Sequence, residues 1–149
     1  MPQAELSLQQ PMHDFEIVRN YVREGRFQRS LCLLTAFASL MSGLEVSYEH
    51  YRGSYSQRVM YTPVILSAAL TCAGLAGFLS RWAARTVLRG VSAITLLDSA
   101  IGFYFHVRGV QRKPGGWHLP LVNMIMGPPI FAPLLFGTSA YLGLIASYL

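Results

Sequence analysis

The chain has 149 residues, of which 52% are hydrophobic and only 13% are charged, and its net charge is +5. Soluble domains carry roughly 25% charged residues, so this composition excludes an ordinary water-soluble domain and predicts an all-α integral membrane protein. The basic residues are nearly all arginines that lie between apolar segments, which favours contact with the headgroups of a lipid bilayer and argues against a nucleic-acid partner.

The N-terminal segment divides into two parts. Residues 1–12 are polar and contain two prolines, and they are predicted to form a flexible tail. Within residues 13–29, Phe15, Val18 and Val22 recur at helical spacing, which predicts a short amphipathic helix at the membrane interface. The alternative is a solvated helix that packs on nothing.

Residues 30–149 contain four apolar segments, over about 30–48, 59–80, 87–107 and 119–149. Each is close to the roughly 20 residues that a helix needs to cross a bilayer, and none has the polar face of a soluble core helix. We therefore predict a single transmembrane domain, a four-helix bundle with up-and-down topology.

The fourth segment, 119–149, is longer than one span and contains Gly127-Pro128-Pro129 and Pro133. Proline removes a backbone donor and interrupts a helix. The sequence predicts a proline-broken segment whose first part is kinked, re-entrant or interfacial.

The basic residues also predict an orientation. Seven arginines lie in the N-terminal segment and the second loop, against five Lys and Arg residues in the first and third loops. The positive-inside rule then places both termini in the cytoplasm, and we expect the membrane to be the cytoplasmic membrane of a bacterium.

Two candidate catalytic residues are ionisable groups within predicted spans. Asp98 lies near the middle of the third span and Glu45 toward the end of the first. A charged group at the centre of a span costs about 2.5–3.5 kcal/mol, so each carboxylate needs a partner or a function. In an up-and-down bundle both lie on the same side of the membrane as His50 and His106.

A metal site is one hypothesis for this side. Glu45 and Glu49 share a helix face, so a site could be made of Glu45, Glu49 and His106, or of His50 and His106. Carboxylate and neutral imidazole ligands suit iron, zinc or manganese. Two histidines could also ligate a haem axially. The sequence lacks Glu-x-x-His, His-Glu-x-x-His and Cys-x-x-Cys. The alternative is that the buried carboxylates pair with arginines or form hydrogen bonds across helices.

The third loop is basic and ends at an interfacial tryptophan. Arg108, Arg112, Lys113 and Trp117 are candidates for contact with headgroups or an acidic partner, although the loop could also be a plain connector. Small-residue rows on the second and fourth spans allow close helix packing within the bundle or against a partner subunit or second copy.

Three functions fit these observations. The first is an accessory or anchoring subunit of a larger membrane complex, with a possible link to redox chemistry. The second is a small metal- or haem-binding membrane enzyme, and the third is a proton-coupled transporter that works as a dimer. The sequence leaves open whether the protein is an enzyme.

Overall fold

The computed structural model describes the backbone of residues 2–149 and the side chains of residues 13–149. This part of the chain is helical and contains no strand, which confirms the all-α prediction. The prediction of a flexible tail over residues 1–12 falls outside the residues whose side chains are described.

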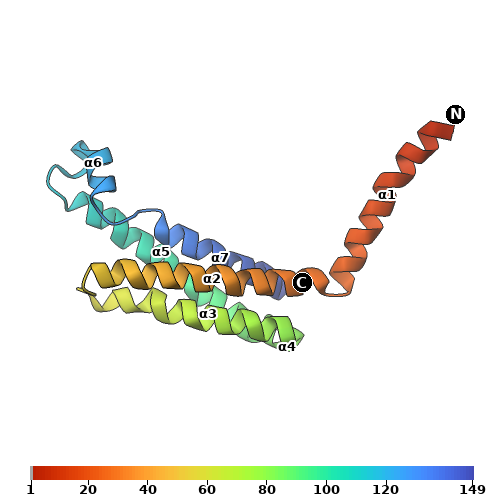
Figure 1. The fold of residues 1–149 in the computed structure, drawn as a ribbon, viewed down its shortest axis with the longest axis horizontal. Helices are drawn as coiled ribbons and strands as arrows, with labels where there is room; N and C mark the ends of the chain where they lie inside the picture. Colours follow the sequence, from red (N-terminus) through yellow and green to blue (C-terminus); the bar gives the residue numbers. More distant parts are fainter. Residues whose placement is uncertain (1) are drawn as a thin grey trace.

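The helices follow one another with short connections (Figure 1). They are α1 (Pro2–Arg23), α2 (Arg26–Arg52), η1 (Arg58–Tyr61), α3 (Thr62–Leu79), α4 (Arg81–Ala83), η2 (Ala84–Leu88), α5 (Arg89–Gln111), η3 (Gly116–His118), α6 (Pro120–Ile125) and α7 (Ala132–Tyr148). The η2 segment is a π-helical turn, and α4, η2 and α5 run on as one helix of 31 residues.

Three helical segments are long and apolar enough to cross a membrane: Arg26–Arg52, Arg58–Leu79 and Arg81–Gln111. They extend beyond the apolar segments of the sequence, because backbone hydrogen bonding continues through the charged residues that flank each one. The fourth apolar segment forms two helices, the short α6 and the 17-residue α7. Pro128 and Pro129 lie between them, where the chain is not helical.

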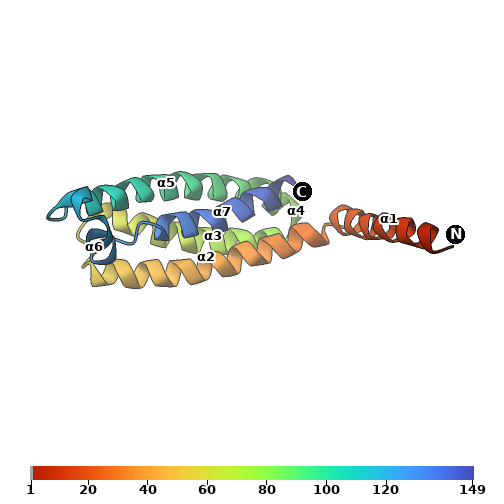
Figure 2. The same ribbon diagram turned by 90° about the horizontal axis from the view of Figure 1, so that it is seen from above.

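Four of these helices lie side by side (Figures 1 and 2). Helix α2 packs against α3 and α7, and α5 packs against the same two helices. The helices α2 and α5 run toward one end of the molecule, and α3 and α7 return from it. As a result, α2 and α5 occupy opposite corners of the arrangement.

The interior is formed mainly by small and hydroxyl-bearing side chains. Fully buried examples are Thr35, Ser39, Ser92, Thr95, Ser139 and Ser147. Large apolar side chains point outward, among them Phe37, Leu40, Ile65, Leu79, Leu97 and Leu135. A soluble helical protein has the opposite distribution, whereas membrane helices pack through small residues and expose large ones to lipid.

Close packing of α2 against α3 depends on Gly74. A Cβ atom at this position would lie 2.8 Å from the carbonyl oxygen of Cys32 and 2.9 Å from the Cβ of Ala36. On α7, Gly143 is buried between two buried serines, Ser139 and Ser147. Ala73 and Gly77 on α3 are buried as well, so small residues of both helices face the inside of the molecule.

The C-terminal end of α7 is capped by two other helices. The Nε2 of Gln28 on α2 donates to the carbonyl oxygen of Ala146 at 2.9 Å. The Nη2 of Arg89 on α5 donates to the carbonyl oxygen of Ser147 at 2.6 Å, and its guanidinium lies 4.1 Å from the ring centroid of Tyr148. These donors satisfy carbonyls that a helix end leaves free, and the arginine charge complements the helix dipole.

Helix α1 points away from the packed helices (Figures 1 and 2). It ends near Gly25, which adopts a left-handed conformation with φ of 71° where the chain changes direction before α2. The apolar side chains Phe15, Val18 and Tyr21 on α1 are exposed. This helix thus presents apolar groups that no other part of the described chain covers.

Candidate functional site

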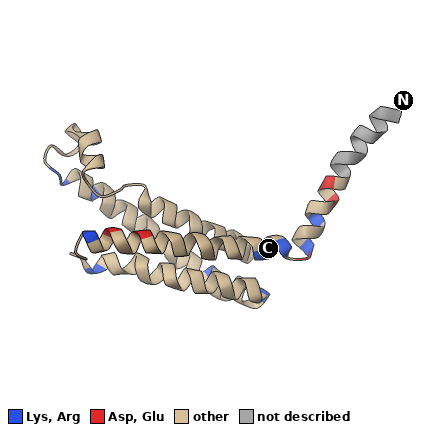
Figure 3. Ribbon diagram, in the orientation of Figure 1, with Lys and Arg blue, Asp and Glu red and all other residues tan. Residues whose placement is uncertain are grey.

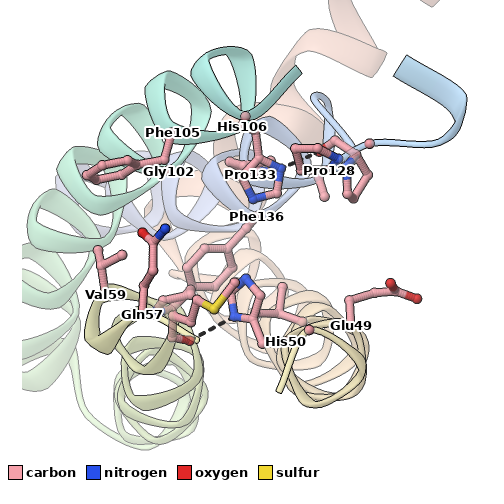
Figure 4. Close-up of a pocket in the computed structure, with 18 of the residues that line it drawn as sticks. Glu49, His50, Gln57, Val59, Gly102, Phe105, His106, Pro128, Pro133 and Phe136 are labelled. Carbon is pink, nitrogen blue, oxygen red and sulfur yellow. Dashed lines mark hydrogen bonds between the residues drawn. The ribbon is translucent and has the colours of Figure 1, made fainter. Parts of the chain in front are cut away.

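A pocket of about 1040 Å³ lies where α2 and α5 end. Its walls come from the last turns of α2, the first turn of α3, the second half of α5 and the segment from Met124 to Phe136 (Figure 4). All the ionisable candidates of the predicted spans line it, namely Glu45, Glu49, His50, Asp98 and His106. The up-and-down path of the chain thus brings the predicted polar residues to one end.

His50 lies near the end of α2 and is half-buried. Its Nδ1 is 2.7 Å from the carbonyl oxygen of Met60, at the turn that leads into α3 (Figure 4). A carbonyl oxygen can only accept, so Nδ1 carries the proton and donates. In the neutral ring this leaves Nε2 unprotonated, with its lone pair available to a ligand.

His106 on α5 repeats this arrangement. The ring is half-buried, and its Nδ1 is 2.7 Å from the carbonyl oxygen of Pro129, in the break between α6 and α7. Figure 4 shows both imidazoles projecting into the space between α2 and α5. Donation from one ring nitrogen to a backbone carbonyl is how metal-binding histidines are oriented in proteins.

The carboxylates of the pocket have other partners. The Oγ1 of Thr62 lies 2.6 Å from Oδ1 of Asp98, so a hydrogen bond joins α3 to α5. Glu49 accepts from Arg52 at 3.1 Å, and Figure 4 shows its carboxylate directed away from the histidines. Glu45 is an exposed part of the wall. The cross-helix hydrogen bond is the alternative that the sequence left open for Asp98.

Metal ligation by three side chains is not assembled here. Among the described residues, no group of three or more His, Cys, Asp and Glu side chains lies close enough to hold one metal ion. The combination of Glu45, Glu49 and His106 is therefore not brought together, because Glu49 turns toward Arg52 on its own helix. What the pocket does offer is a pair of oriented imidazoles.

Basic side chains gather at the outer end of the pocket. Arg52 lines it from α2, and Arg108, Arg112 and Lys113 line it from the end of α5. Figure 3 shows that the Lys and Arg residues of the packed helices lie mainly toward their two ends. Trp117, the fourth residue predicted for headgroup contact, is 44% exposed in η3 beyond the pocket.

The two histidines belong to a sequence repeat that inspection of single residues misses. Residues 48–53 read Tyr-Glu-His-Tyr-Arg-Gly and residues 104–109 read Tyr-Phe-His-Val-Arg-Gly, so both match Tyr-x-His-x-Arg-Gly. The helices that follow also begin alike, with Tyr-Thr-Pro at 61–63 and Phe-Ala-Pro at 131–133. Comparing the chain with itself would have found this signal.

Packing contacts repeat as well. Gly43 lies seven residues before His50 and packs against Ser67, four residues after the proline of α3. Ser99 lies seven residues before His106, and its hydroxyl packs against Gly137, four residues after the proline of α7. The pairs α2–α3 and α5–α7 are thus two similar halves with parallel orientation, and each half supplies one histidine to the shared pocket.

Comparison of the chain with protein-family models, with curated proteins and with solved structures finds no match.

Proposed function

We propose that this chain is an integral membrane protein whose pocket holds a metal centre between His50 and His106. The observation that carries the proposal is that the imidazoles of His50 and His106 form the same kind of hydrogen bond. Each donates Nδ1–H to a backbone carbonyl, and each leaves Nε2 to the pocket. Metal-binding histidines are commonly oriented in this way, with one ring nitrogen donating to a backbone carbonyl and the other facing the metal.

The membrane part of the proposal is that α2, α3, α5 and α7 all span the bilayer. On α2, Arg29 and Arg52 lie 23 residues apart, which corresponds to about 35 Å along a helix. This spacing fits the roughly 30 Å of hydrocarbon between two basic interfaces. The 17 residues of α7 are at the lower limit for a span, and the proline segment before it supplies the remaining depth.

The orientation belongs to the same proposal. The C-terminal end of α7 lies beside the start of α2, so four spans put both chain ends on one side. The arginine excess at that end assigns this side to the cytoplasm of a bacterial cell, with the pocket near the opposite face.

Elemental analysis of the detergent-purified protein for iron, zinc, manganese and copper tests the metal centre. We expect close to one metal per chain in the wild type. His50→Ala and His106→Ala should each lose most of it, because removing a ligand costs more than the roughly 10- to 100-fold in affinity that outer partners contribute.

The matched control is His118→Ala, since His118 is exposed and does not line the pocket. This variant should keep the metal of the wild type. Metal retained at wild-type level in the double variant of His50 and His106 would overturn the site, as would a wild-type protein free of all four metals.

A second candidate function is favoured by α1. Its exposed Phe15, Val18 and Tyr21 and its separation from the other helices give it a surface available to a partner at the membrane interface. We propose that the chain acts as an accessory or anchoring subunit of a membrane complex, with α1 contacting the partner subunit and the basic loop contacting headgroups.

Affinity purification in mild detergent tests this second function. A partner should co-purify in a fixed ratio, and a variant with both Phe15 and Val18 replaced by serine should lose it while remaining monodisperse. Arg19→Ser, on the same helix, serves as the control and should retain the partner. A protein that is always isolated alone contradicts an accessory role.

A further inference from the structure

We infer that the metal centre is a haem, ligated axially by His50 and His106. This inference rests on the proposed function, since it names the chemical class of the group that the two imidazoles hold. Three observations support it: the number of ligands, the lining of the pocket, and the symmetry of the two halves.

The pocket offers too few protein ligands for a bare ion. Zinc sites use at least three protein ligands, and the described residues contain no such group. Copper sites that pair two histidines with a cysteine do not fit, because neither Cys32 nor Cys72 lines the pocket. A haem brings four nitrogen ligands of its own and needs only axial side chains from the protein.

The lining of the pocket matches the three chemical parts of a haem. Its volume of about 1040 Å³ is at the upper end of the roughly 300–1,000 Å³ range of ligand pockets, far more than an ion requires. Apolar and aromatic side chains for a macrocycle come from the walls, including Phe105 and Phe136. Cations for the two propionates come from the outer end, where Arg52, Arg112 and Lys113 line the pocket.

The internal repeat explains why there are two ligands of one kind. Each half of the chain contributes one Tyr-x-His-x-Arg-Gly segment, on α2 and on α5. These helices occupy opposite corners, so the pseudo-two-fold axis between the halves passes between the histidines. A haem has one axial ligand position on each face, and the two positions are equivalent, so it fits a site with one histidine on each side. Cofactor sites of helical bundles are built in this way from facing helices.

Absorption spectroscopy tests the inference on the full-length protein. The chain is expressed with added 5-aminolevulinate, purified in mild detergent, and then titrated with haemin. We expect one haem per chain and a low-spin spectrum with a sharp Soret band and resolved visible bands on reduction. His50→Ala and His106→Ala should each weaken haemin binding by more than about tenfold and abolish the low-spin spectrum.

Two further variants keep the test independent of folding. His118→Ala should bind haem as the wild type does. His106→Gly, which leaves room for a free ligand, should regain the low-spin spectrum when imidazole is added, as only a ligand role predicts. A protein that has merely lost its fold would not respond to imidazole.

The outcomes separate the two proposals. Histidine-dependent metal without a Soret band overturns the haem inference and leaves the metal centre in place. A low-spin spectrum that persists in the double variant of His50 and His106 overturns both, because haem then binds elsewhere. The absence of both metal and haem, even after titration, also overturns both.

Discussion

His50 and His106 differ from the other polar residues of the pocket in how tightly their rings are fixed. Each has a hydrogen bond of 2.7 Å to a main-chain carbonyl in a segment before the next helix. The bond sets the tautomer and directs Nε2, so the sequence position alone would not have told which nitrogen a ligand meets. The ring orientation depends on loops that lie far from the histidines in the sequence.

Asp98 shows how a carboxylate is accommodated inside the packed helices. It accepts a hydrogen bond from the hydroxyl of Thr62, 2.6 Å away on α3. This bond joins two helices through residues 36 positions apart and gives the carboxyl group a partner within the packed helices.

Thr62→Val should therefore destabilise the protein. Valine keeps the shape of threonine but removes the donor to Asp98, and hydrogen bonds between membrane helices contribute about 0.6–1.7 kcal/mol. Thermal unfolding in detergent should show a lower midpoint. Thr138→Val is the control, because the exposed Thr138 hydroxyl bonds only to the carbonyl of Leu135 on its own helix. Equal midpoints for both variants would contradict the role of the Asp98 bond.

At the scale of single elements, the helices are held together by backbone proximity. Gly74 on α3 leaves no room for a methyl group against Cys32 and Ala36 of α2, whereas a Cβ atom added to Gly90 at the start of α5 would have no neighbour within 4 Å. Glycine is therefore required for helix packing at position 74 and not at position 90.

This difference gives a paired prediction. Gly74→Ala should separate α2 from α3 and lower the unfolding midpoint, with a cost of about 1–3 kcal/mol typical of overpacking. Gly90→Ala should be neutral or stabilising, because alanine favours a helix over glycine by about 0.8–1.0 kcal/mol. Thermal unfolding of the two variants in the same detergent checks this. A stabilised Gly74→Ala protein would show that the close approach of the helices is not required.

The segment that contains Pro128 and Pro129 both interrupts the helix and contacts α5. Pro128 and Pro129 interrupt the fourth apolar segment and separate α6 from α7 (Figure 1). The carbonyl of Pro129 then accepts from His106, and Pro128 packs against Gly109 of α5. The same carbonyl also accepts from the backbone N–H of Ala132 at 3.2 Å, so it joins the start of α7 to the His106 ring.

For the molecule as a whole, the decisive feature is the combination of an interior of small side chains with an exterior of large ones. The two halves, α2–α3 and α5–α7, pack side by side, with α2 against α7 and α3 against α5. Their last turns on α2 and α5 bound the pocket, so the site exists only when both halves are packed together.

Labelling of introduced cysteines tests the arrangement of the whole molecule in the membrane. In a background in which Cys32 and Cys72 are replaced by alanine, Lys113→Cys should react with an impermeant maleimide on intact cells. Asp14→Cys and a C-terminal tag should become accessible only after permeabilisation, because the proposed arrangement of four spans has both ends in the cytoplasm. A C-terminal tag that is accessible together with Lys113→Cys would mean that α7 does not cross the bilayer.

The sequence by itself determined the helical class, the positions of the apolar segments and the residues that line the polar end, because hydropathy and charge are local properties. It also contained the repeated Tyr-x-His-x-Arg-Gly segments, although only the pairing of α2 with α5 across the molecule gave them a common site. Tertiary structure alone decided that Asp98 bonds to Thr62 and that both histidines donate from Nδ1. The reason is that side-chain orientation depends on partners distant in the chain, and no local pattern specifies them.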